Sequence, residues 1–350
     1  MHKASDGRLR ELDLLRGAAA LWVVLYHYLR RYHEMYGGID PLGFRIPNGV
    51  LGVQLFFMIS GFVIFMTLHR SRTGWDFVVS RVARLYPAYW VAVPLTFAVG
   101  ALWPLPDQDH GALMLAANMT MLQAYLFVPP VDGVYWSLAY ELGFYTVMLG
   151  LFLLGLLDRI VVIGWVWLGL ALYAHSPADA WLHIPVRVAL LLALKYAHLF
   201  IAGMMFYEIW RKGYAHSRLA LLVGCLGVQL VLECSLRTLV AAGFYAVFWI
   251  AISGKASRLC VPPLLWLGAI SYPLYLTHQM LGYRIIASLR QAGAGYALAA
   301  AVALIFALGL ASAIIWLVER PGRRWLRRAL AVPLRRPQDR KSPAVAGGGS

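Results

Sequence analysis

Long runs of apolar residues, separated by short polar segments, dominate the sequence. A membrane-spanning helix needs about 20 such residues, and ten segments meet or approach this length. They cover residues 12–30, 49–68, 85–103, 136–156, 160–175, 186–210, 219–235, 238–253, 264–286 and 296–318. The stretch 112–127 is apolar but short, and it fits an interfacial or re-entrant helix. The pattern predicts an all-α, polytopic membrane protein with about ten transmembrane helices, embedded in the lipid bilayer.

The composition agrees with this class and excludes an ordinary soluble domain. The chain of 350 residues is 61% hydrophobic and 13% charged, whereas soluble domains carry about 25% charged residues. The three cysteines show no metal-binding spacing, so we predict packing roles for them and no metal site. The net charge of +15 is spread over short loops and the C-terminal tail, which argues against nucleic acid as a partner.

The basic residues predict how the chain crosses the membrane. Most of the 31 lysines and arginines fall on one side when both termini are cytoplasmic, as the positive-inside rule requires. No cleavable signal peptide is predicted, because polar residues precede the first apolar segment and no small-residue cleavage site follows it. Residues 1–330 are predicted to form one membrane domain. Residues 331–350, rich in proline, glycine and basic residues, are predicted to be a disordered tail.

Two polar residues in the first apolar segment are unusual. Arg16 and His27 are eleven residues apart, which places them on one helix face about 16 Å apart along the axis. Ionisable groups inside a membrane generally face a bundle interior or a water-filled cavity, and a neutral imidazole there can accept a proton. Two simpler interpretations remain open: a local ion pair of Arg16 with Asp13, and a hydrogen bond from His27 to a loop carbonyl.

A second pair of arginines precedes the third apolar segment. Arg81 and Arg84 are three residues apart, so both guanidinium groups lie on one face of a helix. Such a pair suits a phosphate-bearing ligand, and it is equally compatible with an ordinary cytoplasmic flank.

Further candidates lie in other apolar segments. Glu141 follows Trp136 and Tyr140 inside an apolar window and needs a partner there, either a substrate hydroxyl or a structural ion pair. The glycine-rich stretch 49–62 predicts close helix approach, and its Gln54 is a possible donor toward a reacting carbonyl. The roles of Lys195, His198 and His278 stay open, and the first two are possible partners of Glu141.

Six stretches, in order along the chain, resemble the membrane acyltransferase family 3, the integral-membrane O-acyltransferases that modify bacterial surface glycans. The matching stretches are LDLLRGAAALWVVLYHY (12–28), GVQLFFMISGFV (52–63), SRVARLYPAYW (80–90), WSLAYELGFY (136–145), ISYPLYLTH (270–278) and ERP (319–321). The first holds the arginine–histidine pair that is typical of the family, and the third holds its Arg-x-x-Arg pattern.

The resemblance implies a ten-helix protein of the bacterial inner membrane. Such a protein takes an acyl group, usually acetyl, from cytoplasmic acyl-CoA and transfers it to a hydroxyl of a periplasmic or lipid-linked glycan. The site residues it implies are His27 as base, Arg16, Arg81 and Arg84 as donor contacts, and Trp136 and Glu141. The sequence departs from the common pattern at Gln54, where many relatives carry an acid, and around Glu141, at Tyr140 and Gly143.

Combining residues and resemblance, we predict an acyl-CoA-dependent O-acyltransferase without a metal. His27 and Glu141 are the predicted catalytic residues, with Glu141 orienting either the histidine or the acceptor. Gln54, Trp136 and Tyr140 are the predicted substrate-binding residues. Three alternatives remain: a proton-coupled transporter or flippase, a non-enzymatic membrane scaffold, and an acyltransferase that modifies a small molecule such as a macrolide.

Overall fold

The computed structural model describes residues 9–37, 49–103, 111–176, 183–233 and 236–330, and this part of the chain contains no β-strand. The α-helices are α1 (Arg10–Tyr26), α2 (Tyr32–Tyr36), α3 (Val50–Arg70), α4 (Gly74–Leu102), α5 (Ala112–Met119), α6 (Trp136–Leu153), α7 (Ile160–Tyr173), α8 (Val186–Leu191), α9 (Ala197–Lys212), α10 (His216–Leu232), α11 (Leu236–Ile252), α12 (Pro262–Gln291), α13 (Tyr296–Ile314) and α14 (Arg320–Ala329). Two π-helical segments, His27–Arg31 and Ile315–Glu319, continue α1 and α13. The predicted all-α class is confirmed.

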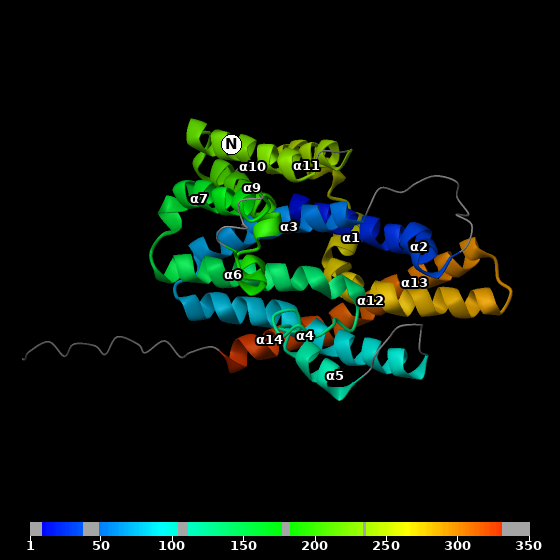
Figure 1. Cartoon of the computed structure of the whole chain (residues 1–350). Coiled ribbons are helices and arrows are strands. Elements are labelled where there is room, and N and C mark those ends of the chain that lie inside the picture. Colours follow the sequence, from blue (N-terminus) through cyan, green and yellow to red (C-terminus); the bar gives the residue numbers. More distant parts are fainter. Residues whose placement is uncertain (1–8, 38–48, 104–110, 177–182, 234–235, 331–350) are drawn as a thin grey trace, which may run out of the picture.

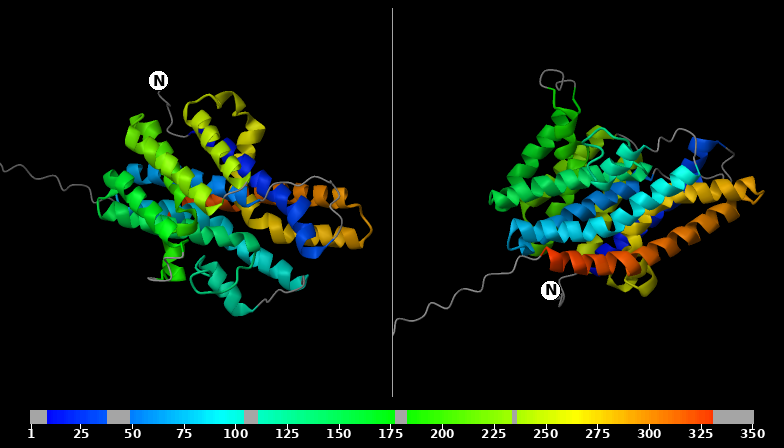
Figure 2. Two further views of the ribbon diagram at one scale, coloured as in Figure 1. Left: turned by 45° about the horizontal axis from the view of Figure 1, so that its top comes forward. Right: turned by 90° about the horizontal axis from the view of Figure 1, so that it is seen from below.

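The long helices run side by side in one bundle (Figure 1). The bundle places α12 between α1 and α13, and α3 lies between α1 and α9. The two further views in Figure 2 show the same arrangement, with α14 at the opposite end of the bundle from α2. This order brings the first and last thirds of the sequence together along α1, α12 and α13.

Among the described residues, five helical stretches are long and apolar enough to cross a membrane. They are Val50–Arg70, Gly74–Leu102, Gly133–Leu153, Val186–Lys212 and Tyr296–Ala329, and His216–Leu232 and Thr238–Ile252 are shorter apolar helices. The finding supports a multi-pass membrane protein. The count of ten helices and the cytoplasmic termini stay predictions, and the tail 331–350 lies outside the described residues.

Glycines allow the central helices to pack closely, as predicted for the stretch 49–62. A Cβ atom on Gly61 would lie 2.1 Å from the carbonyl oxygen of Phe200, and one on Gly203 would lie 2.0 Å from that of Met58. Real Cβ atoms cannot approach a carbonyl so closely, so α3 and α9 meet backbone to backbone only because both positions lack a side chain.

Two predicted segments differ from the structure. Residues 186–210 were predicted as one continuous span, but the helix is interrupted between α8 and α9, where Ala193 has φ = 48°. The carbonyl of Leu192, at this break, accepts a hydrogen bond from the Trp167 indole at 2.7 Å, which satisfies a group that a helix break leaves open. The stretch 112–127 contains only α5, of eight residues, followed by turns in which Met121 and Phe127 have positive φ.

Candidate active site

A cavity inside the bundle brings together four of the predicted site residues. This inner cavity has a volume of about 750 Å³, and Arg16, Arg81, Arg84 and Glu141 all line it. The residues come from α1, α4 and α6, and α3 and α12 complete the wall. Charged groups that are far apart in the sequence therefore line one shared space, as expected for ionisable residues in a membrane protein.

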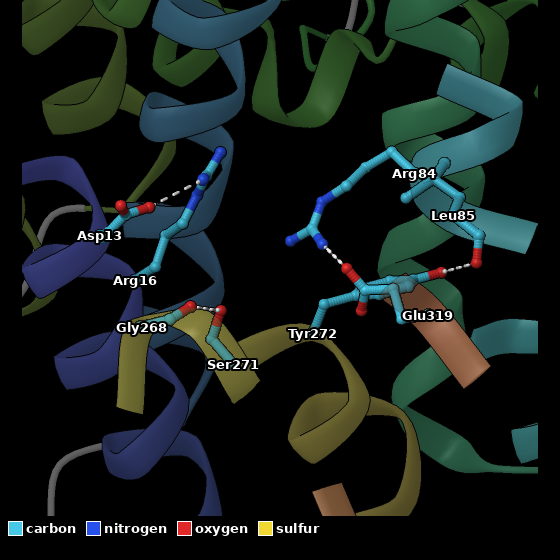
Figure 3. Close-up of polar contacts among 8 residues, drawn as sticks. All are labelled: Asp13, Arg16, Arg84, Leu85, Gly268, Ser271, Tyr272 and Glu319. Carbon is cyan, nitrogen blue, oxygen red and sulfur yellow. Dashed lines mark hydrogen bonds and ion pairs between the residues drawn. The ribbon is translucent and has the colours of Figure 1, made fainter. Parts of the chain in front are cut away.

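The three arginines of the inner cavity differ in their partners. Arg16 forms an ion pair with Asp13 at 3.5 Å, and Arg84 forms one with Glu319, at the end of the second π-helical segment. Figure 3 shows Arg16 and Arg84 extending from opposite sides toward the space between α1 and α4. Arg81 donates to the Ser80 hydroxyl at 2.8 Å, and its Nε has no hydrogen-bond partner among the described residues. Arg81 is thus the arginine least compensated by acidic groups.

A larger basic vestibule adjoins the inner cavity on the side of α14. It has a volume of about 1410 Å³, and Arg16, Arg81 and Arg84 line both spaces. The vestibule adds four further arginines, which are Arg70, Arg320, Arg323 and Arg327. Among the described residues, the acidic ones that line it are Asp13 and Glu319. The vestibule is therefore suited to a ligand that carries several negative charges.

Glu141 is held by hydroxyl groups. Its Oε1 accepts a hydrogen bond from Ser60 Oγ at 2.9 Å and another from the Tyr145 hydroxyl. The suggested pairing with Lys195 or His198 is wrong, because these two residues line a separate cavity beyond α3. The catalytic role of Glu141 stays a prediction, and its position assigns it to the inner cavity and not to the surroundings of His27.

His27 contacts a second histidine. Its Nδ1 lies 2.8 Å from the carbonyl oxygen of Val23 and 3.1 Å from Nε2 of His278. His278 Nδ1 lies 2.9 Å from the carbonyl oxygen of Tyr275, so this nitrogen carries the proton and His278 Nε2 accepts one. His27 Nδ1 must then be the donor to both of its neighbours, which leaves its Nε2 with a free lone pair. We call His27 and His278 the histidine pair.

The histidine pair adjoins the wall of the inner cavity through Tyr275. This tyrosine lines the cavity, and its ring centroid lies 6.0 Å from that of His278. Its hydroxyl donates to the carbonyl of Val134 at 2.8 Å and lies 2.7 Å from Ser137 Oγ. His27 also opens a π-helical segment, a distortion that is frequent at functional sites.

A buried carboxylate fixes α12 beside His278. Asp132 is fully buried, and it accepts hydrogen bonds from the amides of Val134 at 3.2 Å and Met280 at 3.1 Å. The carbonyl of Leu276, on the same turn of α12, accepts a hydrogen bond from the Tyr135 hydroxyl at 3.1 Å. Asp132 and Tyr135 thus hold the turn of α12 that contains His278.

We expect Asp132→Asn to lower kcat about tenfold while the affinity for the acyl donor stays unchanged. The substitution directs an amide N–H at the backbone N–H of Met280 or Val134, which leaves a buried donor unsatisfied and shifts His278. Measuring kcat, its pH dependence and donor affinity in purified variants checks this. A merely structural role would lower the amount of folded protein without changing the pH dependence.

The three predicted substrate-binding residues gather around Tyr196. The ring centroid of Tyr196 lies 5.6 Å from that of Trp136 and 5.0 Å from that of Tyr140. Gln54 and Tyr196 both line a third space, which we call the polar cavity. Their role in binding stays a prediction, but the structure places all three near Tyr196.

The sequence pattern did not assign a role to several residues that the structure places in these sites. His278 is a histidine in an apolar segment, which marks it as a candidate, but nothing in the sequence indicates that it contacts His27. Glu319 lies within the ERP stretch, but nothing in the sequence predicts that it pairs with Arg84. The arginines of α14 were read only as a cytoplasmic flank, although their spacing of three to four residues places Arg320, Arg323 and Arg327 on one helix face.

Comparison with known proteins now identifies the family. The family described as an acyltransferase domain matches residues 9–318. The chain belongs to this acyltransferase family. The enzyme is 28% identical over 313 residues to the exopolysaccharide production protein ExoZ of Rhizobium meliloti, an alignment that covers 82% of the chain and 93% of ExoZ.

A second relative has a name that describes acyl transfer. The acyltransferase is 26% identical to BcsY of Komagataeibacter xylinus, a putative membrane-bound transacylase by its name, over 90% of the chain and 83% of BcsY. It is also 28% identical to nodulation protein 10 of Rhizobium leguminosarum bv. viciae over 40% of the chain and 43% of that protein. No solved structure matches the chain.

Proposed function

We propose that this enzyme transfers an acyl group, most simply acetyl, from acyl-CoA to a hydroxyl of a cell-surface or periplasmic polysaccharide. The observation that carries the proposal is the basic vestibule that leads into the inner cavity, with seven arginines along its wall. Coenzyme A has phosphate groups at one end and a thin pantetheine arm at the other, which corresponds to a wide basic space followed by a narrow one. The names of ExoZ and BcsY support a polysaccharide acceptor and acyl transfer respectively.

In this proposal the end of the bundle that carries α14 faces the cytoplasm, where acyl-CoA is made. The arginines of the vestibule hold the phosphates with charge-assisted hydrogen bonds. The pantetheine arm extends through the inner cavity past Arg16 toward Tyr275, which directs the thioester toward the histidine pair. The enzyme is accordingly expected in the bacterial inner membrane, with the acceptor on the opposite side.

The proposed chemistry uses His27 as a general base. Its Nε2 takes the proton of the acceptor hydroxyl while the oxygen attacks the thioester carbonyl. The tetrahedral intermediate then collapses, the C–S bond breaks, and the thiolate of coenzyme A takes the proton back from the imidazolium. The products are the ester and free coenzyme A. His278 accepts from Nδ1–H of His27, so it holds the ring in the required tautomer and stabilises the imidazolium.

A direct assay tests the proposal and separates it from a transporter. The purified protein is incubated with acetyl-CoA labelled in the acetyl group and with exopolysaccharide from which esters were removed by mild base. We expect label in the polymer and release of one thiol for each ester formed. Succinyl-CoA in parallel tests the acyl group. Uptake of substrate into proteoliposomes without thiol release would contradict the proposal and favour a carrier.

A small-molecule acceptor remains the second candidate within the family. A soluble macrolide in place of the polysaccharide tests it in the same assay. If only the macrolide becomes labelled, the proposal of acyl transfer stands and the proposed polysaccharide acceptor is wrong.

A further inference from the structure

The polar cavity is separate from the inner cavity and has no role in the mechanism above. It has a volume of about 330 Å³ and is lined by Gln54, His175, Lys195, Tyr196, His198, Gln229, Leu232 and Glu233. His175 and Lys195 are exposed at its mouth, whereas Gln54, His198 and Gln229 are only 1–2% exposed. The cavity therefore opens at the surface and has a buried polar base, formed by α3, α9 and α10.

One carboxylate determines the orientation of both amides at this base. Oε2 of Glu233 accepts hydrogen bonds from Nε2 of Gln54 at 3.2 Å and from Nε2 of Gln229 at 3.0 Å. A carboxylate only accepts, so both amides must direct their nitrogen at it. The carbonyl oxygens of Gln54 and Gln229 consequently point away from Glu233.

The orientation of Gln229 in turn fixes the tautomer of His198. Gln229 Oε1 lies 2.6 Å from Nε2 of His198. An amide oxygen is an acceptor, so this nitrogen carries the proton, and Nδ1 of His198 has a lone pair. Within the described part of the chain, neither this Nδ1 nor Oε1 of Gln54 has a hydrogen-bond partner, although both atoms are buried. Both residues line the cavity, so two buried acceptors that lack donors among the described residues lie in its base.

Two buried acceptors without donors call for a ligand that supplies hydrogen-bond donors, because unsatisfied buried groups are costly. An anion would be repelled by the two lone pairs, and an apolar ligand would leave them unsatisfied. A cation would be attracted by the carboxylate of Glu233, but this carboxylate already accepts from two amides, and a cation would have to pass the ammonium group of Lys195 at the mouth. Neutral hydroxyl groups remain, and the ring of Tyr196, packed against Trp136 and Tyr140, provides a flat apolar wall beside them.

We propose that the polar cavity binds one sugar unit of the polysaccharide acceptor, with two sugar hydroxyls donating to Gln54 Oε1 and His198 Nδ1. The inference rests on the proposed function for the identity of the polymer. Because α3 separates this cavity from the histidine pair, the bound unit is not the one that is acylated. The bound unit fixes the position of the polysaccharide while a hydroxyl elsewhere on the polymer reaches His27.

A binding experiment tests this without requiring catalysis. The full-length protein is purified in a detergent that has no sugar headgroup, and methyl glycosides of glucose, galactose, mannose and rhamnose are titrated and followed by ligand-observed NMR. Propylamine and acetate serve as probes of the other ligand classes. We expect saturable binding of at least one glycoside and none of the amine or the carboxylate. Saturable binding of propylamine instead would overturn the assigned ligand class.

Matched variants locate the site. Gln54→Leu and His198→Phe each remove one acceptor, and we expect each to weaken glycoside binding about tenfold. Gln123→Leu is the control, because Gln123 is also buried with an unpartnered Oε1 but does not line this cavity. Lys195→Trp fills the mouth from an exposed position, so it tests the site even when the buried variants do not fold. Unchanged affinity in Lys195→Trp would overturn the proposal.

These experiments distinguish failure of the sugar-site inference from failure of the proposed function. When the protein binds glycosides but does not consume acyl-CoA, the sugar site stands and the acyltransfer proposal fails. When acyl-CoA is consumed and no glycoside binds, this inference fails alone. In the active enzyme we expect Gln54→Leu to raise KM for the polymer about tenfold while donor affinity remains that of the unmodified protein.

Discussion

Replacing His27 with glutamine is expected to lower kcat by about 10²–10⁴-fold, the usual contribution of a general base. Glutamine is similar in size and polarity, so the turn of α1 should persist, but it cannot accept the proton of the acceptor hydroxyl. Donor binding should be unchanged because His27 lies outside the inner cavity and the vestibule. Thiol release from acyl-CoA in the presence of polymer measures kcat, and calorimetric titration with coenzyme A measures donor binding.

His69→Gln is the matched control for this experiment. Its Nδ1 lies 3.0 Å from the carbonyl oxygen of Phe65, four residues earlier, which is the geometry of His27 with Val23. His69 is half-buried and lines neither the inner cavity nor the vestibule, so its removal should leave kcat within about twofold. An active His27→Gln enzyme with a normal amount of folded protein would rule out the base and leave His27 a structural residue.

The hydrophobic pattern predicts most of the architecture because membrane helices are recognised one at a time. The length of each apolar run is enough to predict a membrane helix. The glycines of the stretch 49–62 predict close packing, but they do not indicate which helix packs there. The break at Ala193 was missed because its cause is tertiary: the carbonyl there is satisfied by Trp167, on another helix. Local sequence carries no signal for such compensation.

The sequence predicts which charged residues belong to the candidate site, but it does not predict which of them contact one another. Arginines and a carboxylate in or beside apolar segments are expected to converge, and Arg16, Arg81, Arg84 and Glu141 share one cavity. Which group contacts which depends on helix order and rotation. The contact of His27 with His278 joins residues 251 positions apart, and no periodicity reports it. Gln54 shows the same limit, because its amide donates to Glu233, 179 positions away, and no local pattern indicates this partner.

Arg84→Gln is expected to have two separate effects. First, it leaves the buried carboxylate of Glu319 without its ion pair, which should destabilise the protein by about 3–5 kcal/mol. Second, it removes a guanidinium from the wall shared by the vestibule and the inner cavity, which should weaken coenzyme A binding about 10–100-fold, the value of one charge-assisted hydrogen bond. Thermal unfolding in detergent measures the first effect and calorimetric titration measures the second.

The double variant Arg84→Gln with Glu319→Gln separates the two effects. It removes the uncompensated charge, so most of the lost stability should return, while the weak donor binding should persist because the guanidinium is still absent. Arg324→Gln is the control for net charge, since Arg324 is on α14 but does not line the vestibule. If the double variant binds coenzyme A as tightly as the unmodified enzyme, Arg84 serves only to neutralise Glu319. The donor phosphates would then have to be held by the arginines that lack a buried acidic partner, with Arg81 foremost.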